Sequence, residues 1–344
     1  MTTSQTVHKR RPTQADVARL ANVSQVVVSA VHNPASRITV AAETRRRVLA
    51  AAEGLGYVPN PAARSLRTQR TMTIAGVIPD IGNPFYPAFQ RGIQDVADRY
   101  GYDLLIANTD GVPEKERKAV RMLAQGRVDG IVLSPLHLTP DDIQPALDAG
   151  VALAVFGALR DLPDIRVDRL AVDNERAAYA AVSHLIDRGH TRIAMIAGAE
   201  DTPPRLERVR GYQRALADHA IPHDEILVRG GEFTQTGGAQ TMRELLTLQP
   251  RPTAVFAAND LMAMGALVAL REAGLRVPQE MAIVGFDDIP AAELVDPPLT
   301  TVAQFPHRLG SRAAELLFER LRGEAPECGR FEEMPFELVV RAST

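Results

Sequence analysis

The stretch from Asp16 to Asn33 reads DVARLANVSQVVVSAVHN, and it has the pattern of two short helices joined by a tight turn. Thr13 stands three residues before Asp16, which predicts a helix N-cap with an acid in the first turn. Asn22 interrupts the pattern, and asparagine tolerates the left-handed backbone conformation that ends a helix. Ser24 then predicts the cap of a second helix. The stretch therefore indicates a helix-turn-helix.

Apolar residues at helical spacing predict one inward face on each helix. The inward residues are expected to be Val17, Leu20 and Ala21 in the first helix and Val27, Val28 and Val31 in the second. A third helix is predicted in VAAETRRRVLAAAEGLG after Thr39, with Gly54 and Gly56 ending it. Two short helices across a turn with a third bracing helix form a minimal DNA-reading unit.

Length and charge divide the chain into a small basic head and a larger acidic body. Its 344 residues suit two or three compact units. Residues 1–70 hold eleven Lys/Arg and three Asp/Glu, a net charge of +8, whereas the remainder carries −11. A basic head with helical periodicity favours a polyanionic partner over a solvated tail.

The composition also excludes several classes of protein. The opening MTTSQTVHKRR lacks the apolar core of a secretory signal, and the longest apolar stretch, VALAVFGAL, is about half of a membrane span. A single cysteine, Cys328, excludes an intrachain disulfide and a cysteine-rich zinc site. We therefore expect a cytoplasmic protein with no membrane contact.

In the body, short apolar runs alternate with amphipathic helices. The runs are TIAGVI, DLLIAN, DGIVLS and ALAVFG, then RIAMIAG, EILVRG, TAVFAA and MAIVGF. Alternation at this spacing predicts parallel sheets with right-handed crossovers. Because the pattern occurs twice with a break near Asp173, we expect two doubly wound α/β subdomains.

Polar residues follow the predicted strands, at the edge where such sheets bind ligands. They are Asp80, Asn108, Thr109, Asp110, Ser134, Gly157, Phe233, Asn259, Asp260, Asp287 and Asp288. Carboxylate and amide acceptors beside an aromatic ring suit a sugar, a nucleoside or a similar polyol. Asp260 is also explained as the cap of a helix beginning at Leu261, and Asp288 as a structural residue.

An enzymatic function is not supported by any motif. The chain contains no HExxH, GxxxxGK[ST], GxGxxG or GxSxG, so we expect no catalytic residues, metal or cofactor. Asp287 and Asp288 leave open a metal site or an acid/base pair. His184 and His190 are spaced at i, i+6, which is wrong for two ligands on one helical face.

Five segments carry a family resemblance in the right order over nearly the whole chain. They are ADVARLANVSQVVVSAVHN, TRRRVLAAAEGLGYVPNPAARSLRTQRTMTIAGVIPD, VDNERAAYAAVSHLIDRGHTRIAMIAG, PTAVFAANDLMAMGALVALREAGLRVP and MAIVGFDDIPAAELVDPPLTTVAQ. The chain resembles bacterial transcription regulators of the LacI/GalR (lactose-repressor) family. The resemblance implies an all-α helix-turn-helix head and two doubly wound parallel α/β subdomains of periplasmic-binding-protein-like type.

The resemblance also implies the domain boundaries. Residues 1–60 are expected to form the DNA-binding domain, 61–72 a hinge helix, and 73–344 an effector-binding and dimerisation core. The chain is expected to cross back after PPLTTVAQ. Subdomain N then comprises about 73–172 and 303–330, and subdomain C about 173–302 and 331–344.

On this resemblance, one set of residues is expected to contact DNA. Those at major-groove positions are Ser24, Gln25, Val26 and Ser29, and those of the hinge at the minor groove are Ala63, Arg64, Leu66 and Arg67. Leu66 would be the apolar wedge that bends the duplex. Many relatives have an arginine where this chain has Ala30, and often a threonine where it has Val27. Since an arginine–guanine pair gives about 1–3 kcal/mol of discrimination, we expect a half-site that differs at that base.

Another set is implied at the effector site. It comprises Asp80, Phe85, Arg208, Phe233, Asn259, Asp287 and Gln304, with Phe233 at a position of stacking aromatics. Arg208 is also explained as a solvated charge at a helix start. Gly157 stands where some sugar-binding relatives carry an acid, so their ligand does not transfer directly.

The leading hypothesis is a repressor that binds double-stranded operator DNA as a homodimer and responds to a small-molecule effector. Two-fold symmetry implies a pseudo-palindromic site. The alternatives are a solute-binding protein, disfavoured by the basic head and the lack of an export signal, and a sugar-metabolising enzyme. The effector's identity, and whether it releases or recruits DNA, stay open. The sequence shows no C-terminal heptad segment, so we expect no tetramer-forming helix.

Overall fold

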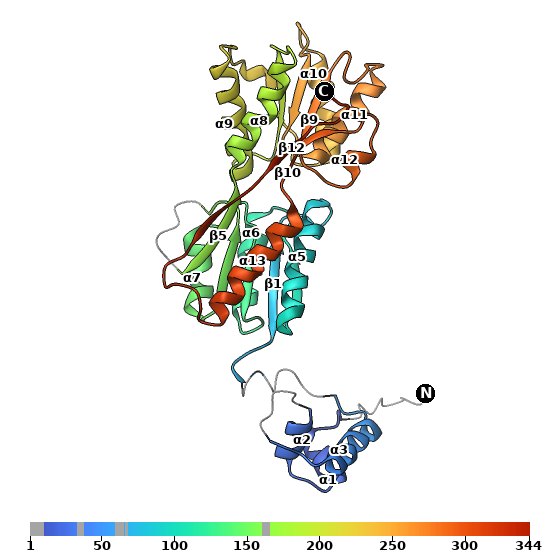
Figure 1. The fold of residues 1–344 in the computed structure, drawn as a ribbon, viewed down its shortest axis with the longest axis vertical. Helices are drawn as coiled ribbons and strands as arrows, with labels where there is room; N and C mark the ends of the chain where they lie inside the picture. The colour runs from blue at the N-terminus through green and yellow to red at the C-terminus, as the bar shows by residue number, and fades with distance from the viewer. Residues whose placement is uncertain (1–9, 33–37, 59–64, 66–67, 160–165) are drawn as a thin grey trace, which may run out of the picture. The chain divides into compact units, whose positions relative to one another are not determined.

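The computed structural model describes residues 10–32, 38–58, 65, 68–159 and 166–344. The chain divides after Thr71 into a head and a core, which are described separately (Figure 1). No helix among these residues is both long enough and apolar enough to cross a bilayer.

The head is a three-helix unit, with α1 at Gln14–Leu20, α2 at Gln25–Val31 and α3 at Ala42–Leu55. The predicted caps are confirmed. The Asp16 carboxylate accepts hydrogen bonds from the backbone N–H of Thr13 at 2.9 Å and from its hydroxyl at 2.7 Å, and these bonds lower the pKa of Asp16. Asn22 adopts φ 50°, and Ser24 Oγ accepts from the N–H of Val27.

The core of the head contains Val17, Val28 and Val48, which are fully buried. The prediction that Leu20 packs inward is wrong, because its side chain is 61% exposed. Ala18 and the predicted Ala21 are buried beside Val17, at 6% and 4% exposure.

The core contains two lobes, each with a six-stranded sheet. The first-lobe sheet has the order β11-β5-β4-β3-β1-β2, and the second-lobe sheet has the order β12-β10-β9-β8-β6-β7. All pairings are parallel except that between β10 and β12. The prediction of two doubly wound parallel subdomains is confirmed.

The strand bounds follow the predicted apolar runs closely. The first-lobe strands are β1 Thr73–Ile78, β2 Asp103–Asn108, β3 Gly130–Leu133, β4 Ala152–Phe156, β5 Val167–Val172 and β11 Phe331–Met334. The second-lobe strands are β6 Ile193–Ala197, β7 Val228–Gly230, β8 Ala254–Ala257, β9 Ala282–Asp287, β10 Thr300–Ala303 and β12 Glu337–Val339. The run EILVRG begins as the 3-10 helix η1 (Glu225–Leu227) and becomes a strand only in its second half.

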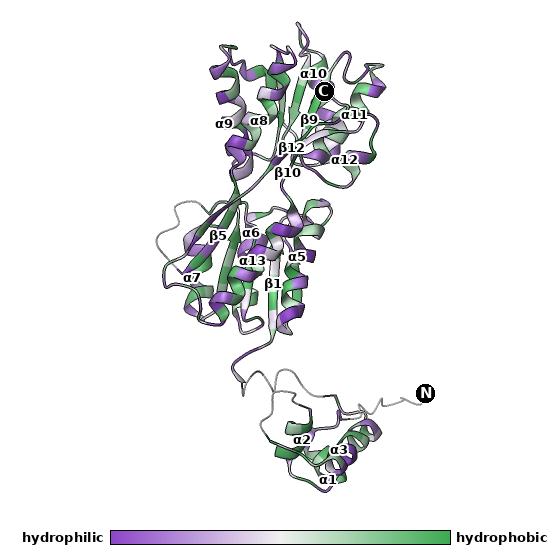
Figure 2. Cartoon of the chain, in the orientation of Figure 1, coloured by the Kyte–Doolittle hydropathy of each residue, from purple (hydrophilic) through white to green (hydrophobic). Residues whose placement is uncertain are grey.

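Helices cover both faces of each sheet, with their hydrophilic sides outward (Figure 2). The first lobe has α5 Phe85–Tyr100 packed against α13 Pro306–Leu321, and α6 Pro113–Ala124 against α7 Pro140–Asp148. The second lobe has α8 Asn174–Asp187 packed against α9 Pro203–Asp218, and α10 Gln235–Leu246 against α11 Asp260–Glu272, with the short α12 at Ala291–Leu294. Gly310 of α13 allows close helix contact, because a Cβ there would lie 1.9 Å from the carbonyl oxygen of Phe89.

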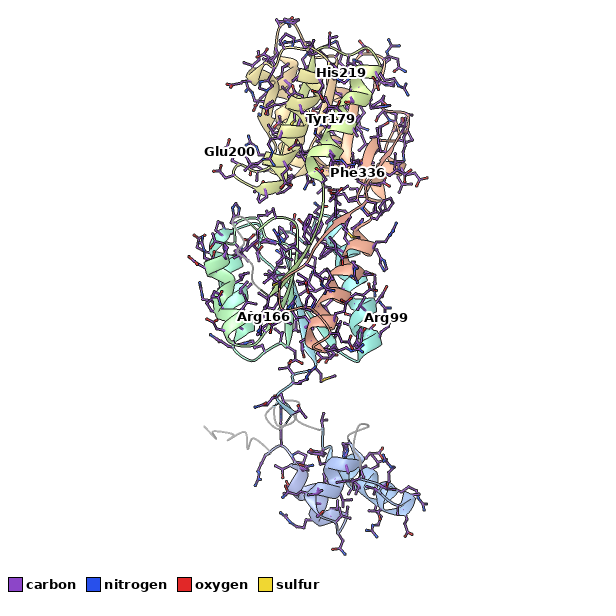
Figure 3. The ribbon with its side chains drawn as sticks, turned by 60° about the vertical axis from the view of Figure 1, so that its left-hand side comes forward. Arg99, Arg166, Tyr179, Glu200, His219 and Phe336 are labelled. Atoms are coloured by element: carbon purple, nitrogen blue, oxygen red, sulfur yellow. The ribbon has the colours of Figure 1, made fainter. Side chains whose placement is uncertain are left out.

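The chain crosses between the lobes three times, after β5, after β10 and between β11 and β12. The last crossing corrects the expected boundary at residue 330, because Phe331–Met334 pair with Arg169–Val172 in the first lobe. Strand β11 has the sequence FEEM at an exposed sheet edge, so it lacked an apolar pattern. Phe336 lies at this crossing and packs against the core (Figure 3).

A buried carboxylate fastens the returning chain to the first lobe. Asp168 of β5 is fully buried and accepts hydrogen bonds from Arg320 of α13 at 2.9 and 3.0 Å and from Arg330 at 3.0 Å. Burial alone would raise the pKa of Asp168, but the two arginines hold it below its ordinary value. This cluster ties the end of α13 and the start of β11 to strand β5.

Candidate effector cavity and DNA-reading helix

A cavity of about 360 Å³ is lined by residues of both lobes of the core. The lining comes from the segments that follow β1, β2, β3, β4 and β5 of the first-lobe sheet and β6, β7, β8, β9 and β10 of the second-lobe sheet. These are the carboxyl ends of the parallel strands, where ligands of such sheets bind. The volume lies within the range of small-molecule sites, roughly 300–1,000 Å³.

The structure brings all seven predicted effector residues to this cavity. They are Asp80, Phe85, Arg208, Phe233, Asn259, Asp287 and Gln304. Asp110, Ser134 and Gly157 also line it, whereas Asn108, Thr109, Asp260 and Asp288 lie outside the lining.

Asp287 is the buried acceptor at the end of β9. Its side chain is 6% exposed, and Oδ1 accepts a 2.7 Å hydrogen bond from Gln304 Nε2. Burial raises the pKa of Asp287 to about 6, although Arg208 and the Gln304 hydrogen bond act in the opposite direction. Above that pH the cavity presents a poorly hydrated carboxylate, which is a strong acceptor for ligand hydroxyls.

Arg208 is a buried part of the cavity, so the reading of a solvated charge is wrong. It is 6% exposed, and its guanidinium lies 3.7 Å from the ring centroid of Phe286. Nε donates to Asn174 Oδ1 at 2.8 Å, and Nη1 donates to the carbonyl oxygen of Ala258. Burial holds the pKa of Arg208 below its ordinary value, and the nearby Asp287 carboxylate acts in the opposite direction.

Asn259, and not Asp260, caps α11. Its Oδ1 accepts from the N–H of Met262 at 2.9 Å, and its Nδ2 donates to the carbonyl oxygen of Phe233 at 3.0 Å. One side chain thus starts α11 and holds the loop that carries the cavity aromatic.

Asp260 and Asp288 have structural partners. Asp260 is fully buried and accepts from the N–H of Ile289 at 2.9 Å and from Thr301 Oγ1 at 2.6 Å. Burial, with the nearby Asp287 charge, raises the pKa of Asp260 well above its ordinary value. Asp288 pairs with Arg341 at 2.8 Å. Among the residues the structure describes, no group of three or more His, Cys, Asp or Glu side chains is placed to hold a metal ion.

The aromatic face of the cavity depends on a glycine. Phe233 has φ 57° and lies directly over Gly198, where an added Cβ would be 1.8 Å from its Cζ. On the first-lobe side, the rings of Phe85 and Phe156 stack with centroids 5.8 Å apart. Apolar ring faces beside carboxylate and amide acceptors suit the two kinds of surface of a sugar.

Sequence reasoning missed several lining residues. They include Tyr86, His137, Asn174, Pro203, Pro204, Glu207 and Glu232. Tyr86 and Glu207 adjoin predicted residues, which was an available signal. Asn174 gave none, because it follows β5, a strand that carries the charged pair Asp168 and Arg169 and was not predicted.

Helix α2 of the head has a solvent-accessible side. Ser24, Gln25 and Val26 are exposed and Ser29 is half-buried, so the four predicted major-groove residues share the accessible side of the helix. Ala30 is only 4% exposed. The predicted hinge contacts Ala63, Arg64, Leu66 and Arg67 lie outside the described residues.

The head also carries basic residues, which differ in their contacts. Arg10, Arg11, Arg46 and Arg47 are exposed. Arg45 instead donates from Nη1 to the carbonyl oxygen of Val31 at 3.2 Å and so braces α3 against the end of α2. Gln14 donates to the Gln25 carbonyl oxygen at 3.1 Å, which fixes the start of α2 against α1.

Comparison with known proteins gives a consistent result for both parts of the chain. Residues 13–60 match the model of bacterial regulatory proteins of the lacI family, and residues 182–344 match a periplasmic binding protein-like domain. The chain is 39% identical to the HTH-type transcriptional regulator CelR of Thermobifida fusca over 342 residues, covering 97% of this chain and 99% of the relative. It is 37% identical to the HTH-type transcriptional repressor PurR of Vibrio atlanticus, covering 95% and 97% of the two chains.

Solved structures of similar proteins cover the same length. The CelR–cellobiose complex is 37% identical, covers 97% of this chain and 100% of its own, and has a TM-score of 0.73. The lac repressor dimer bound to operator and the anti-inducer ONPF is 29% identical, covers 97% and 99%, and has a TM-score of 0.83. These relatives are transcription regulators and not enzymes. The chain therefore belongs to the lacI family of bacterial regulatory proteins, and it is a DNA-binding regulator of transcription that responds to an effector.

Proposed function

We propose that the protein is a transcriptional repressor that binds a pseudo-palindromic operator as a homodimer, and that a sugar or a related polyol or nucleoside in the core cavity controls its operator affinity. The observation that carries this proposal is the convergence of Asp80, Phe85, Arg208, Phe233, Asn259, Asp287 and Gln304 from both lobes on one cavity.

The chemistry of the cavity supports a polyhydroxylated effector. Asp287 offers a buried carboxylate, Gln304 and Asn259 offer amide groups, and Phe233 offers a ring face. A sugar ring has hydroxyls around its edge and an apolar face, so it satisfies both kinds of surface. The solved complex of the CelR relative with cellobiose is consistent with this class of ligand.

Exposed apolar residues support a homodimer. Leu105 and Ile106 of the edge strand β2 are 46% and 47% exposed, and Leu294 of α12 is 83% exposed. Apolar side chains gathered at a sheet edge favour burial against another chain. A two-fold dimer presents two heads, and two heads match a two-fold symmetric DNA site.

Control of DNA affinity follows from a cavity built by two lobes. An effector that contacts both lobes stabilises the lobe arrangement in which those contacts are made, which is a shift of population between two states. The crossing after β10 links the cavity residue Gln304 directly to Phe305 and then to α13 of the first lobe. Residues 61–72, proposed as the hinge, would carry the change to the heads, with Ala63, Arg64, Leu66 and Arg67 at the minor groove.

A DNA-binding measurement on the full chain tests the proposal. Fluorescence anisotropy with DNA from upstream of the gene, at low salt, should show binding that depends on a pseudo-palindrome. Neutral sugars and nucleosides should then change that affinity. An absence of DNA binding at low salt would contradict the proposal, and so would binding that no sugar or nucleoside alters.

A further inference from the structure

The cavity lining has more acidic than basic side chains, and one of its acids, Asp110, is paired with Lys115 outside the lining. The lining contains five carboxyl groups, one guanidinium and one imidazole. The carboxyl groups belong to Asp80, Asp110, Glu207, Glu232 and Asp287. Ionised carboxylates are acceptors only, so they receive hydrogen bonds from hydroxyls and oppose a ligand that brings further negative charge.

The single arginine is already engaged within the protein. Arg208 donates through Nε to Asn174 Oδ1 and through Nη1 to the Ala258 carbonyl oxygen, and one face of its guanidinium lies on the Phe286 ring. A bidentate clamp on a phosphate needs two adjacent free N–H groups of the guanidinium fork. Nε is therefore not available for such a clamp, and the adjacent Asp287 carboxylate further balances the charge of Arg208.

Four helix N-termini near the cavity already have a side-chain acceptor for one of their N–H groups. The N-terminus of a helix attracts a phosphate through its free N–H groups and its dipole. At α5, α8, α10 and α11, a side chain already accepts from an N-terminal N–H. The four acceptors are Asn83, Asp173, Thr234 and Asn259, at 3.1, 2.9, 3.0 and 2.9 Å.

Helix α9 differs from these four helices. It begins with Pro203 and Pro204, both of which line the cavity. Proline has no backbone N–H, so this helix start lacks two of the donors that a phosphate would use. One turn later, Glu207 adds a carboxylate to the same end of the helix and accepts from Asn174 Nδ2 at 2.9 Å.

We propose that this cavity selects effectors without an anionic group, so that a free sugar or nucleoside is recognised and its phosphate ester is rejected. The inference rests on the proposed function, because it names the class of effector for the same cavity. It places the signal before phosphoryl transfer: the protein senses the free ligand, and a kinase that phosphorylates the ligand removes the signal.

Matched ligand pairs test the inference on the full chain. The probes are glucose with glucose 6-phosphate, cellobiose with its 6-phosphate, and adenosine with adenosine 5′-monophosphate. Calorimetric titration should give at least about tenfold weaker binding for the phosphate ester of the recognised pair, because like charges then face one another. Equal or tighter binding of the ester would overturn the inference.

A variant pair separates charge repulsion from a loss of shape. Glu207→Gln keeps an acceptor for Asn174 but removes one cavity charge. The difference in affinity between the free ligand and its ester should therefore become smaller. Glu200→Gln is the matched control, because the Glu200 side chain is 80% exposed outside the cavity lining (Figure 3). If the ratio of the affinities for free ligand and ester is the same in Glu207→Gln, in Glu200→Gln and in the unaltered protein, the charge of the lining does not determine the preference for the free ligand.

Inorganic phosphate is a probe that tests anion binding before the sugar is identified. At equal ionic strength, phosphate should raise the melting temperature no more than chloride does. A specific rise that Arg208→Gln or a bound neutral ligand removes would overturn the inference. If no neutral ligand binds while DNA binding is intact, the proposed effector class fails, and the phosphate arm still decides the charge inference.

Discussion

Gln304 Nε2 donates a 2.7 Å hydrogen bond to Oδ1 of Asp287, and both side chains are nearly fully buried in the cavity wall. Asp287 ends β9, and Gln304 lies between β10 and the crossing into α13 of the first lobe. A ligand that binds Asp287 therefore contacts the second lobe beside a chain segment that leads into the first. This hydrogen bond connects the cavity carboxylate of the second lobe to the segment that leads into the first lobe.

The ionisation of Asp287 predicts a specific pH dependence of stability. Its pKa in the folded protein is about 6, above the ordinary value of 3.8, because burial disfavours the charged form. Folding therefore favours the protonated carboxyl. The free energy of unfolding is therefore highest, as far as Asp287 is concerned, below about pH 4. It falls by about 3 kcal/mol in all as the pH rises to about 6 and above.

Asp287→Asn should remove that pH-dependent loss. We expect the variant to be more stable than the unaltered protein by up to about 3 kcal/mol at pH 7.5, and by clearly less at pH 5. Urea unfolding at the two pH values measures the difference. A stability difference of the same size at pH 5 and at pH 7.5 would show that Asp287 does not titrate in this range.

Gly198→Ala should weaken effector binding by displacing an aromatic ring. The added Cβ would lie 1.8 Å from Cζ of Phe233, so the ring has to leave its place on the cavity wall. We expect at least about tenfold weaker binding of the recognised sugar, since a ring contact is lost and the cavity shape changes. Calorimetric titration measures the affinity.

Gly230→Ala is the matched control for that substitution. A Cβ at Gly230 has only Glu232 Oε1 at 3.8 Å among its neighbours, which is ordinary contact. Its sugar affinity should equal that of the unaltered protein. Equal sugar affinity in Gly198→Ala would mean that Phe233 does not contact the effector.

Glu116→Gln should loosen the cavity wall from outside the cavity. Glu116 of α6 is 1% exposed, and its two carboxylate oxygens accept from the N–H groups of Leu136 and His137, each at 3.0 Å. Glutamine leaves one of these N–H groups facing an amide donor, which costs about 1–3 kcal/mol of the free energy of unfolding. Urea unfolding and sugar titration should both report the change.

Glu114→Gln serves as the comparison on the same helix. Its side chain is 79% exposed and forms a surface ion pair with Arg117 at 3.6 Å. The free energy of unfolding should change by less than about 0.5 kcal/mol. A Glu116→Gln protein as stable as Glu114→Gln would disprove the bracing role of Glu116.

We expect different residues of the head to read bases and to bind phosphates. Gln25→Ala should relax the preference at one base pair by about 1–3 kcal/mol, whereas Arg10→Ala should weaken binding to all sequences and lower the salt slope by about 1. Selection from random DNA should also return a half-site unlike the usual family operator at the base that an arginine in place of Ala30 would read. Recovery of the usual operator with full preference there would contradict this reading of α2.

The sequence predicted the features that depend on local pattern. Apolar runs such as TIAGVI identified most strands, and the polar residues after them identified the cavity edge, because strand ends of one parallel sheet meet there. Cap residues such as Thr13 were equally readable, since their hydrogen bonds are made within three residues.

Features that depend on distant partners could not be read. Strand β5 contains Asp168, whose charge is balanced by Arg320 and Arg330, about 150 residues later in the chain. Glu116 looks like any exposed helix glutamate until the loop after β3 is seen to cover it. Arg208 was ambiguous for the same reason, because Asn174 and the Ala258 carbonyl oxygen are brought to it only by the fold.

The most direct test of the account is the operator affinity of the full chain, measured by fluorescence anisotropy at low salt with and without the recognised neutral sugar. We expect the sugar to change the affinity of the unaltered protein by about 5–150-fold, the usual range of coupling between two sites. Asp287→Asn should bind the operator with the same affinity as the unaltered protein but show no response to the sugar. An exposed control, Glu293→Gln, should respond fully. A chain that does not bind DNA, or an Asp287→Asn variant that responds as the unaltered protein does, would contradict the account.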